Sequence, residues 1–148
     1  MALIRLNYAV ELRYGVLVDI ARKVWAREPV DVSNGCFNCI WQGDANEMIL
    51  RSLALVAAPA AAWNLTGLER VKVRDVAEMF AGLLNREVHF TGVEAETALL
   101  SNSARICAEL GAPSMSLDMM IRWIAKWVQT GGRFLDKPTH FETRDGIY

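Results

Sequence analysis

A short apolar strand, an amphipathic helix and a second short strand follow one another in mid-chain, and this order most constrains the fold. The strand pattern Trp63–Leu65 ends in the polar turn Thr66-Gly67, and the pattern Glu87–Phe90 follows the helix. Between them, apolar residues recur at helical spacing, and they form one face: Val73, Val76, Ala77, Phe80, Leu83 and Leu84. This arrangement predicts a small α+β lobe, with Asn85 as the carboxyl cap of the helix.

Helical periodicity recurs in four other segments, so we expect four to five helices in all. An apolar stripe before Pro29 consists of Val16, Leu17, Ile20, Ala21, Val24 and Trp25. A helix from Asp44 is expected to stop before Pro59, and its apolar residues are Met48, Ile49, Leu53 and Val56. Two further helices are expected over 102–110 and from about Ser116 to Gly131-Gly132, where the glycines terminate the pattern.

Strand patterns occupy the remaining segments. Residues 3–10 are apolar with little alternation, which predicts a buried central strand, although the chain offers few strands to flank it. Asn34-Gly35 is a tight-turn signal between Val30–Val32 and Phe37–Trp41, and it predicts a hairpin. Asp44 and Glu47 have capping-box spacing, so we expect Asp44 to cap the next helix.

Size and charge set the broad class. The 148 residues are expected to form one domain, 1–148, whose residues 133–148 form a polar and aromatic tail along the surface. Hydrophobic residues make up 53% of the chain, which favours a packed globule. A net charge of -1 argues against nucleic acid and anionic lipid as partners. We find no membrane-spanning run and no secretion signal, so we expect a cytoplasmic protein.

The three cysteines are interpreted as free thiols. Cys36 and Cys39 have the spacing of a redox or metal pair, but they fall in a strand-like run, where residues three apart point to opposite faces. Cys107, His89 and His140 are scattered singly. We therefore expect no metal site and two buried or half-buried small residues at 36 and 39.

The order of these elements resembles the carboxyl-terminal part of the extended short-chain dehydrogenase/reductases, the NAD-dependent epimerase/dehydratases. The strand Ile4–Tyr8 looks like the family strand that carries an arginine and then an asparagine before a substrate-reaching loop. Trp63–Gly67 resembles the family's asparagine, aliphatic, small, glycine strand end. Ser103–Arg105 with Glu109–Gly111 is similar to the serine-lysine-alanine … glutamate-leucine-glycine element, and the resemblance covers nearly the whole chain.

Two family motifs are absent from this sequence. No group of glycines between a strand and a helix matches the dinucleotide fingerprint, so no cofactor-binding residue is assigned. No tyrosine has a lysine four residues later, so no catalytic residue is assigned either. The resemblance implies NAD or NADP for a complete family member. It places Phe37 and Asn38 where nucleotide-sugar members have a diphosphate-binding arginine, which argues against such a substrate.

The resemblance also implies five substrate-binding candidates: Asn7, Tyr8, Arg13, Tyr14 and Asn38. Asn7 could equally satisfy loop amides and Tyr8 could pack in the core, while Arg13 could hold an anion or be solvated. His89 is expected to point to solvent and Trp41 to lie in the core. Trp123 and Trp127 are either packing residues or part of an apolar patch that a partner covers.

Three functional hypotheses stay open. The first is the substrate-binding carboxyl-terminal portion of an NAD-dependent epimerase/dehydratase-like protein, without the Rossmann sheet. We expect this chain alone to be inactive, and whether the protein is an enzyme stays undecided. The second is a stand-alone interaction module that forms a homo-oligomer through an open strand edge. The third is a subunit that complements a separate Rossmann-domain chain; a small molecule is the expected substrate.

Overall fold

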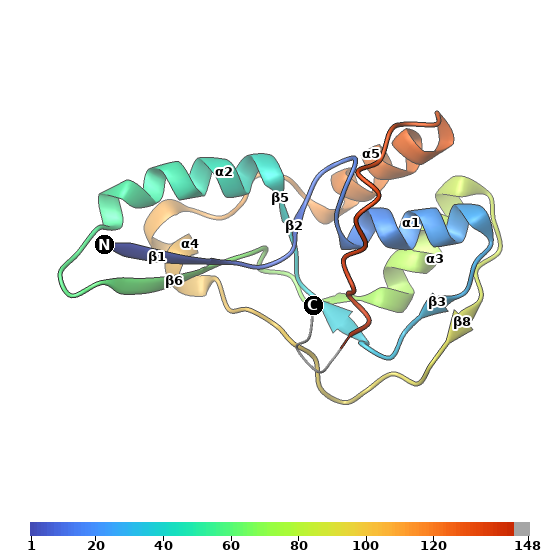
Figure 1. Ribbon diagram of the computed structural model, residues 1–148, viewed down its shortest axis with the longest axis horizontal. Helices are drawn as coiled ribbons and strands as arrows, with labels where there is room; N and C mark the ends of the chain where they lie inside the picture. The colour runs from blue at the N-terminus through green and yellow to red at the C-terminus, as the bar shows by residue number, and fades with distance from the viewer. Residues whose placement is uncertain (144–148) are drawn as a thin grey trace.

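The computed structural model describes residues 1–143 and shows two groups of elements (Figure 1). The paired segments around residues 7–10 and 38–41 lie between the two groups, and we call this region the waist. The strands are β1 Ala2–Leu6, β2 Ala9–Val10, β3 Val30–Asp31, β4 Cys36–Phe37, β5 Ile40–Trp41, β6 Ala61–Leu65, β7 Val71–Lys72 and β8 Phe90–Thr91. The helices are α1 Val16–Ala26, α2 Gln42–Arg51, α3 Val73–Leu84, α4 Ala104–Leu110 and α5 Leu117–Gln129, with a 3-10 turn at Ser52–Leu55. The predicted α+β lobe of about five helices with short strands is confirmed.

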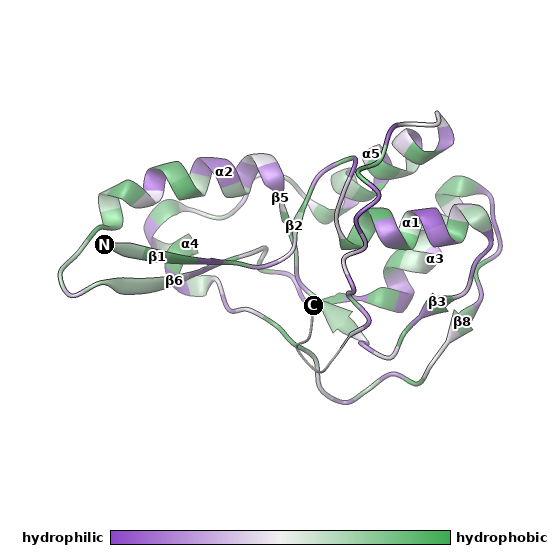
Figure 2. Cartoon of the chain, viewed as in Figure 1, coloured by the Kyte–Doolittle hydropathy of each residue, from purple (hydrophilic) through white to green (hydrophobic). Residues whose placement is uncertain are grey.

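Helices α1, α3 and α5 form the larger of two hydrophobic clusters. Each is amphipathic, and hydrophobic and hydrophilic residues alternate along their ribbons (Figure 2). Their buried faces match the predicted stripes, and the largest fully buried side chains in the three helices are Leu17, Ile20, Phe80, Ile121 and Ile124. Burial of each such side chain stabilises the fold by about 1.5–3 kcal/mol. Trp25 and Leu83 were expected on these faces and are partly exposed instead.

The second cluster lies at the other end of the molecule, where the parallel pair β1–β6 packs with α2 and α4. Its buried members are Ile40, Ala45, Met48, Trp63, Leu65, Ile106 and Leu110. The apolar face predicted for α2 is only partly buried, because Leu53 and Val56 lie beyond the helix and are exposed.

The prediction of a buried central strand at residues 3–10 is wrong. In the described chain, β1 pairs with β6 alone, in the register Ala2↔Ala61 to Leu6↔Leu65. Leu3 and Leu6 are 45% and 44% exposed. An apolar strand becomes central only when neighbours cover both edges and both faces, and residues 1–143 supply one neighbour.

The predicted hairpin around Asn34-Gly35 is also wrong. Strand β3 pairs with β8, β4 pairs with β7, and β5 pairs with β2. The turn residues are used in tertiary contacts, since buried Asn34 donates its Nδ2 to the Phe141 carbonyl over 2.7 Å. The Gly35 carbonyl accepts from the Val73 amide, which anchors the start of α3.

One of the two predicted helix caps is confirmed, since Asn85 ends α3 in the left-handed conformation with φ 51°. Helix α5 begins after Ser116, close to the predicted start, and the structure adds that the Ser116 Oγ accepts from the Met119 amide. Asp44 is not a cap, because α2 begins two residues earlier, at Gln42. The Asp44 carboxylate accepts hydrogen bonds from Ser114 and Met115 in the loop before α5 instead.

The described part of the tail, residues 133–143, folds back onto α1. Phe141 is 1% exposed and belongs to the larger cluster, and Asp19 Oδ2 accepts from both the amide and the hydroxyl of Thr139. Most of this segment is exposed, but the Phe141 ring enters the core, which the expectation of a tail along the surface did not include. The rest of the tail, with Tyr148, lies outside the described residues.

Candidate functional site

Asn7 and Asn38 lie together at the waist of the molecule, where β1 ends. The Asn7 amide continues the strand ladder to the Leu65 carbonyl, and its side-chain Nδ2 donates to Asn38 Oδ1 over 3.0 Å. Asn38 Oδ1 also accepts from the Ser101 amide, and Asn38 Nδ2 donates to the carbonyls of Ser101 and Gly67 over 2.6 and 3.4 Å. Asn38 is 6% exposed, so its side chain joins three chain segments that are distant in sequence.

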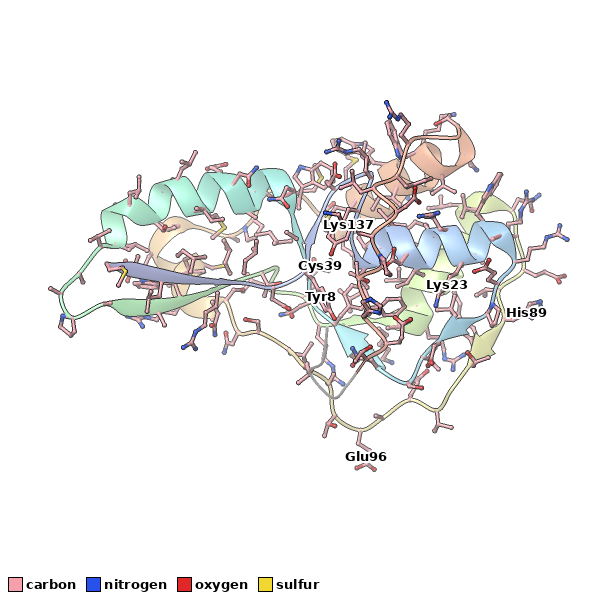
Figure 3. All side chains as sticks on the ribbon, viewed as in Figure 1. Tyr8, Lys23, Cys39, His89, Glu96 and Lys137 are labelled. Atoms are coloured by element: carbon pink, nitrogen blue, oxygen red, sulfur yellow. The ribbon has the colours of Figure 1, made fainter. Side chains whose placement is uncertain are left out.

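Tyr8 follows Asn7 and packs against the same junction. Its backbone has φ 42°, and its carbonyl accepts from the Ile40 amide over 3.1 Å. Its ring meets Phe37 edge to face with centroids 6.5 Å apart. The structure thus places Tyr8, Asn7 and Asn38 in one region, which Figure 3 marks at Tyr8.

Arg13 and Tyr14 belong to a tight turn before α1, and no hydrogen bond within residues 1–143 joins them to the asparagine pair. Arg13 Nε lies 3.0 Å from both carboxylate oxygens of Glu11, and its side chain is 53% exposed. Glu11 and Tyr14 form a backbone bridge, and the Arg13 carbonyl accepts from the Leu135 amide of the tail. An incoming anion would compete with Glu11 for Arg13.

The three tryptophan candidates have structural partners. Trp41 and Trp123 meet edge to face at 5.8 Å, with Trp41 half-buried and Trp123 44% exposed. Trp127 donates its Nε1 to the Arg133 carbonyl over 3.2 Å. His89 is exposed, as its alternation predicts.

The cysteines are free, with Cys36 and Cys39 each 6% exposed and Cys107 half-buried, so the predicted burial at 36 and 39 is confirmed. Burial, with a smaller contribution from the negative charge of Glu69, raises the pKa of the Cys39 thiol to about 12. Within residues 1–143 no three His, Cys, Asp or Glu side chains are grouped as metal ligands would be.

Two helices of the described chain have a glycine at or near the start, Gly15 before α1 and Gly43 in α2. A pyrophosphate requires open glycine backbone between a strand and a helix. At Gly15, which precedes α1, a side-chain position would meet Val10 at 3.0 Å, and at Gly43 in α2 it would meet the Trp41 indole at 2.8 Å. A side chain at either position would therefore meet protein atoms, and no step is assigned to a cofactor held by these residues.

Sequence reasoning missed the part that Ser101 and Gly67 play at the waist. Both contribute backbone groups to the Asn38 side chain, and Ser101 is 63 residues distant. The only signal for Gly67 was its place at the end of the Trp63–Gly67 strand motif, and the sequence holds none for Ser101.

Solved structures share this fold. The chain superimposes on a UDP-glucose 4-epimerase of Thermus thermophilus with NAD, at 14% identity and a TM-score of 0.63, over 86% of this chain and 46% of that one. It matches a UDP-glucuronic acid 4-epimerase of Bacillus cereus with NAD at 9% identity and a TM-score of 0.70, over 87% and 44%. RMD of Pseudomonas aeruginosa with NADPH matches at 17% identity and a TM-score of 0.68, over 87% and 48%.

The chain therefore shares the fold of one portion of these solved structures, which confirms at the level of the fold the resemblance predicted from sequence. It spans less than half the length of each of these structures. No family model and no curated protein matches the sequence. Among the helices within residues 1–143, none has the length and apolar character needed to cross a membrane.

Proposed function

We propose that this chain is the substrate-binding carboxyl-terminal portion of an epimerase/dehydratase-like protein, and that it acts with a nucleotide-binding half in the same polypeptide or in a second one. The observation that carries the proposal is strand β1. Its second edge has no strand partner within residues 1–143, and Leu3 and Leu6 are nearly half exposed beside it. A further strand on that edge would satisfy the free backbone groups, and elements packed on the two faces of the extended sheet would bury the leucines, which point to opposite faces.

The solved structures support this arrangement, since each is more than twice as long as the matched region and was determined with NAD or NADPH. Asn7, Tyr8 and Asn38 lie at the end of β1, where such a half would adjoin the lobe. Because both Asn38 amide groups are used inside the chain, its proposed part is to position Asn7 and the Gly67 backbone, while Asn7 and Tyr8 contact substrate. Arg13 and Tyr14 are proposed as a more distant edge of the site.

The chain alone is proposed to be inactive in redox chemistry. The test has two arms. Isothermal titration of the purified chain with NAD is expected to show no binding, and micromolar affinity would refute the proposal. The coding sequence before and beside this chain is then searched for a glycine fingerprint and a Tyr-x-x-x-Lys pair, and the encoded half is co-expressed with it. We expect a stable complex that binds NAD; a half that remains separate would count against the proposal.

A second candidate function is a homo-oligomeric interaction module. It is favoured by a group of exposed apolar side chains in the last turn of α2 and just after it, at the same end of the molecule as strand β1. They are Leu50, Leu53 and Val56, at 69%, 73% and 57% exposure. Size-exclusion chromatography with light scattering tests it: a dimer that Leu53→Lys dissociates would support it, and a clean monomer would end it.

A further inference from the structure

A cavity of about 190 Å³ lies between the loop after β6 and the start of α5, on the segment that follows Asn38. Neither Asn7 nor Asn38 lines it. Its walls are mostly apolar, formed by Leu68, Pro113, Met115, Leu117 and Met120. Cys39, which Figure 3 marks at the waist, closes one side.

The walls of this cavity are fixed by hydrogen bonds rather than by packing alone. The Asp44 carboxylate, 7% exposed, accepts from the Ser114 hydroxyl over 2.8 Å and from the Met115 amide over 2.9 Å. On the opposite wall, the Gly67 amide donates to the Cys39 carbonyl over 3.1 Å. A charge-assisted bond to the loop before α5 makes the cavity pre-formed, which lowers the cost of binding.

Glu69 gives the cavity its electrostatic character, because it is the one charged residue in the lining. Its carboxylate has no ion-pair partner among residues 1–143. It lies close enough to the Cys39 thiol to disfavour the thiolate. The neighbouring cations Arg70 and Lys72 do not line the cavity. Leu68, Glu69 and Ala112 are exposed, so the Glu69 carboxylate lies on the solvent-facing side of a mostly apolar cavity. An unpaired carboxylate in that position repels anions and favours a cation with an apolar body.

We propose that this cavity binds a small organic cation, a primary alkylammonium group whose apolar chain lies among Met115, Leu117 and Met120 and whose ammonium pairs with Glu69. The volume equals that of about six water molecules at roughly 30 Å³ each, which suits a chain of about four to six carbons. The proposal goes beyond the proposed function and does not depend on it, since the cavity is complete within this chain.

The test uses three probes with the same number of carbon atoms, n-pentylammonium, 1-pentanol and pentanoate, titrated into the ¹⁵N-labelled chain and followed by amide chemical shifts. We expect saturable shifts at Gly67–Glu69 and Ala112–Leu117 with pentylammonium. Pentanol is expected to bind about five-fold more weakly, the amount that a partly exposed ion pair contributes, and pentanoate not at all.

Variants separate the two parts of the proposal. Glu69→Gln is expected to lower the pentylammonium affinity to that of pentanol, while Glu87→Gln, an exposed carboxylate away from the cavity, leaves it unchanged. Ala112→Leu narrows the cavity from an exposed loop position and is expected to weaken pentylammonium and pentanol alike. The proposal would be overturned by equal binding of the three probes, by shifts outside the cavity, or by the absence of saturable binding at millimolar concentration. It would also be overturned if Glu69→Gln left the pentylammonium affinity unchanged.

Discussion

The side chain of Asn7 donates to Asn38 Oδ1 over 3.0 Å and ties the end of β1 to the segment between β4 and β5. The Asn38 Nδ2 in turn donates to the carbonyls of Ser101 and Gly67. One buried amide therefore connects the β1–β6 pair, the β4–β5 segment and the loop before α4. The position of the substrate candidates Asn7 and Tyr8 depends on this single side chain.

Replacing Asn38 by alanine is expected to lower the free energy of unfolding by about 3 kcal/mol. The change removes two side-chain donors and an acceptor, and leaves the Ser101 amide and carbonyl without their partner in a part-buried position. Urea denaturation measures the effect. Asn46→Ala is the matched control: Asn46 is exposed and accepts only from Gln42, so its replacement should alter stability by about 0.5 kcal/mol or less. Equal effects in the two variants would contradict the connecting role of Asn38.

Asp44→Ala is expected to destabilise the chain by about 2–3 kcal/mol, because a buried carboxylate that accepts from Ser114 and Met115 is lost and the Met115 amide is left unpaired. Thermal unfolding followed by circular dichroism measures the change. On the same helix, Glu47 forms an exposed pair with Arg51, and Glu47→Ala should cost about 0.5 kcal/mol. If Asp44 were a helix cap alone, the Asp44→Ser variant would restore stability; we expect that it does not.

The helices could be predicted from the sequence and the strand pairings could not. The apolar faces of α1, α3 and α5 repeat within a dozen residues, so periodicity alone locates them. Val30 pairs with Phe90, and the Asn34 side chain reaches Phe141, contacts between segments 60 or more residues apart. Nothing local to Asn34-Gly35 distinguishes a hairpin turn from a turn held by the tail.

The candidate site shows the same division. Asn7, Tyr8 and Asn38 were selected through the family resemblance, and the structure brings them together, yet their role in substrate binding stays a prediction. Asp44 was assigned to its own helix because Glu47 has capping-box spacing, while its partners lie 70 residues later. In the sequence, an acidic residue near a helix start is read as a cap of that helix. Only the fold shows that the Asp44 carboxylate accepts hydrogen bonds from the loop before α5 instead.

Stability is expected to fall above pH 9 because of Cys39. Its thiol has an ordinary pKa of 9.0 and, in the folded chain, a pKa of about 12, raised mainly by burial. Between these values the unfolded chain loses a proton that the folded chain keeps, so the stabilisation is complete below pH 9 and declines by up to about 1.4 kcal/mol per pH unit above it. Urea unfolding of the reduced chain at pH 8, 9, 10 and 11 measures the slope. The Cys39→Ala variant should have a shallower slope by this amount, and parallel curves would contradict the prediction.

Gly67→Ala is expected to destabilise the chain by about 2–3 kcal/mol, because the added methyl group would overlap the Cys39 carbonyl that the Gly67 amide now contacts. The displaced backbone would also disturb the carbonyl that accepts from Asn38. Gly82→Ala provides the opposite case in the same chain, since Gly82 lies within α3 with open space around it. Alanine there should stabilise by about 0.5–1 kcal/mol through helix propensity. Denaturant midpoints that move in opposite directions are the expected outcome, because one glycine is required by a close backbone approach and the other is not. A Gly67→Ala midpoint at or above that of the unaltered chain would show that the Cys39–Gly67 contact can relax.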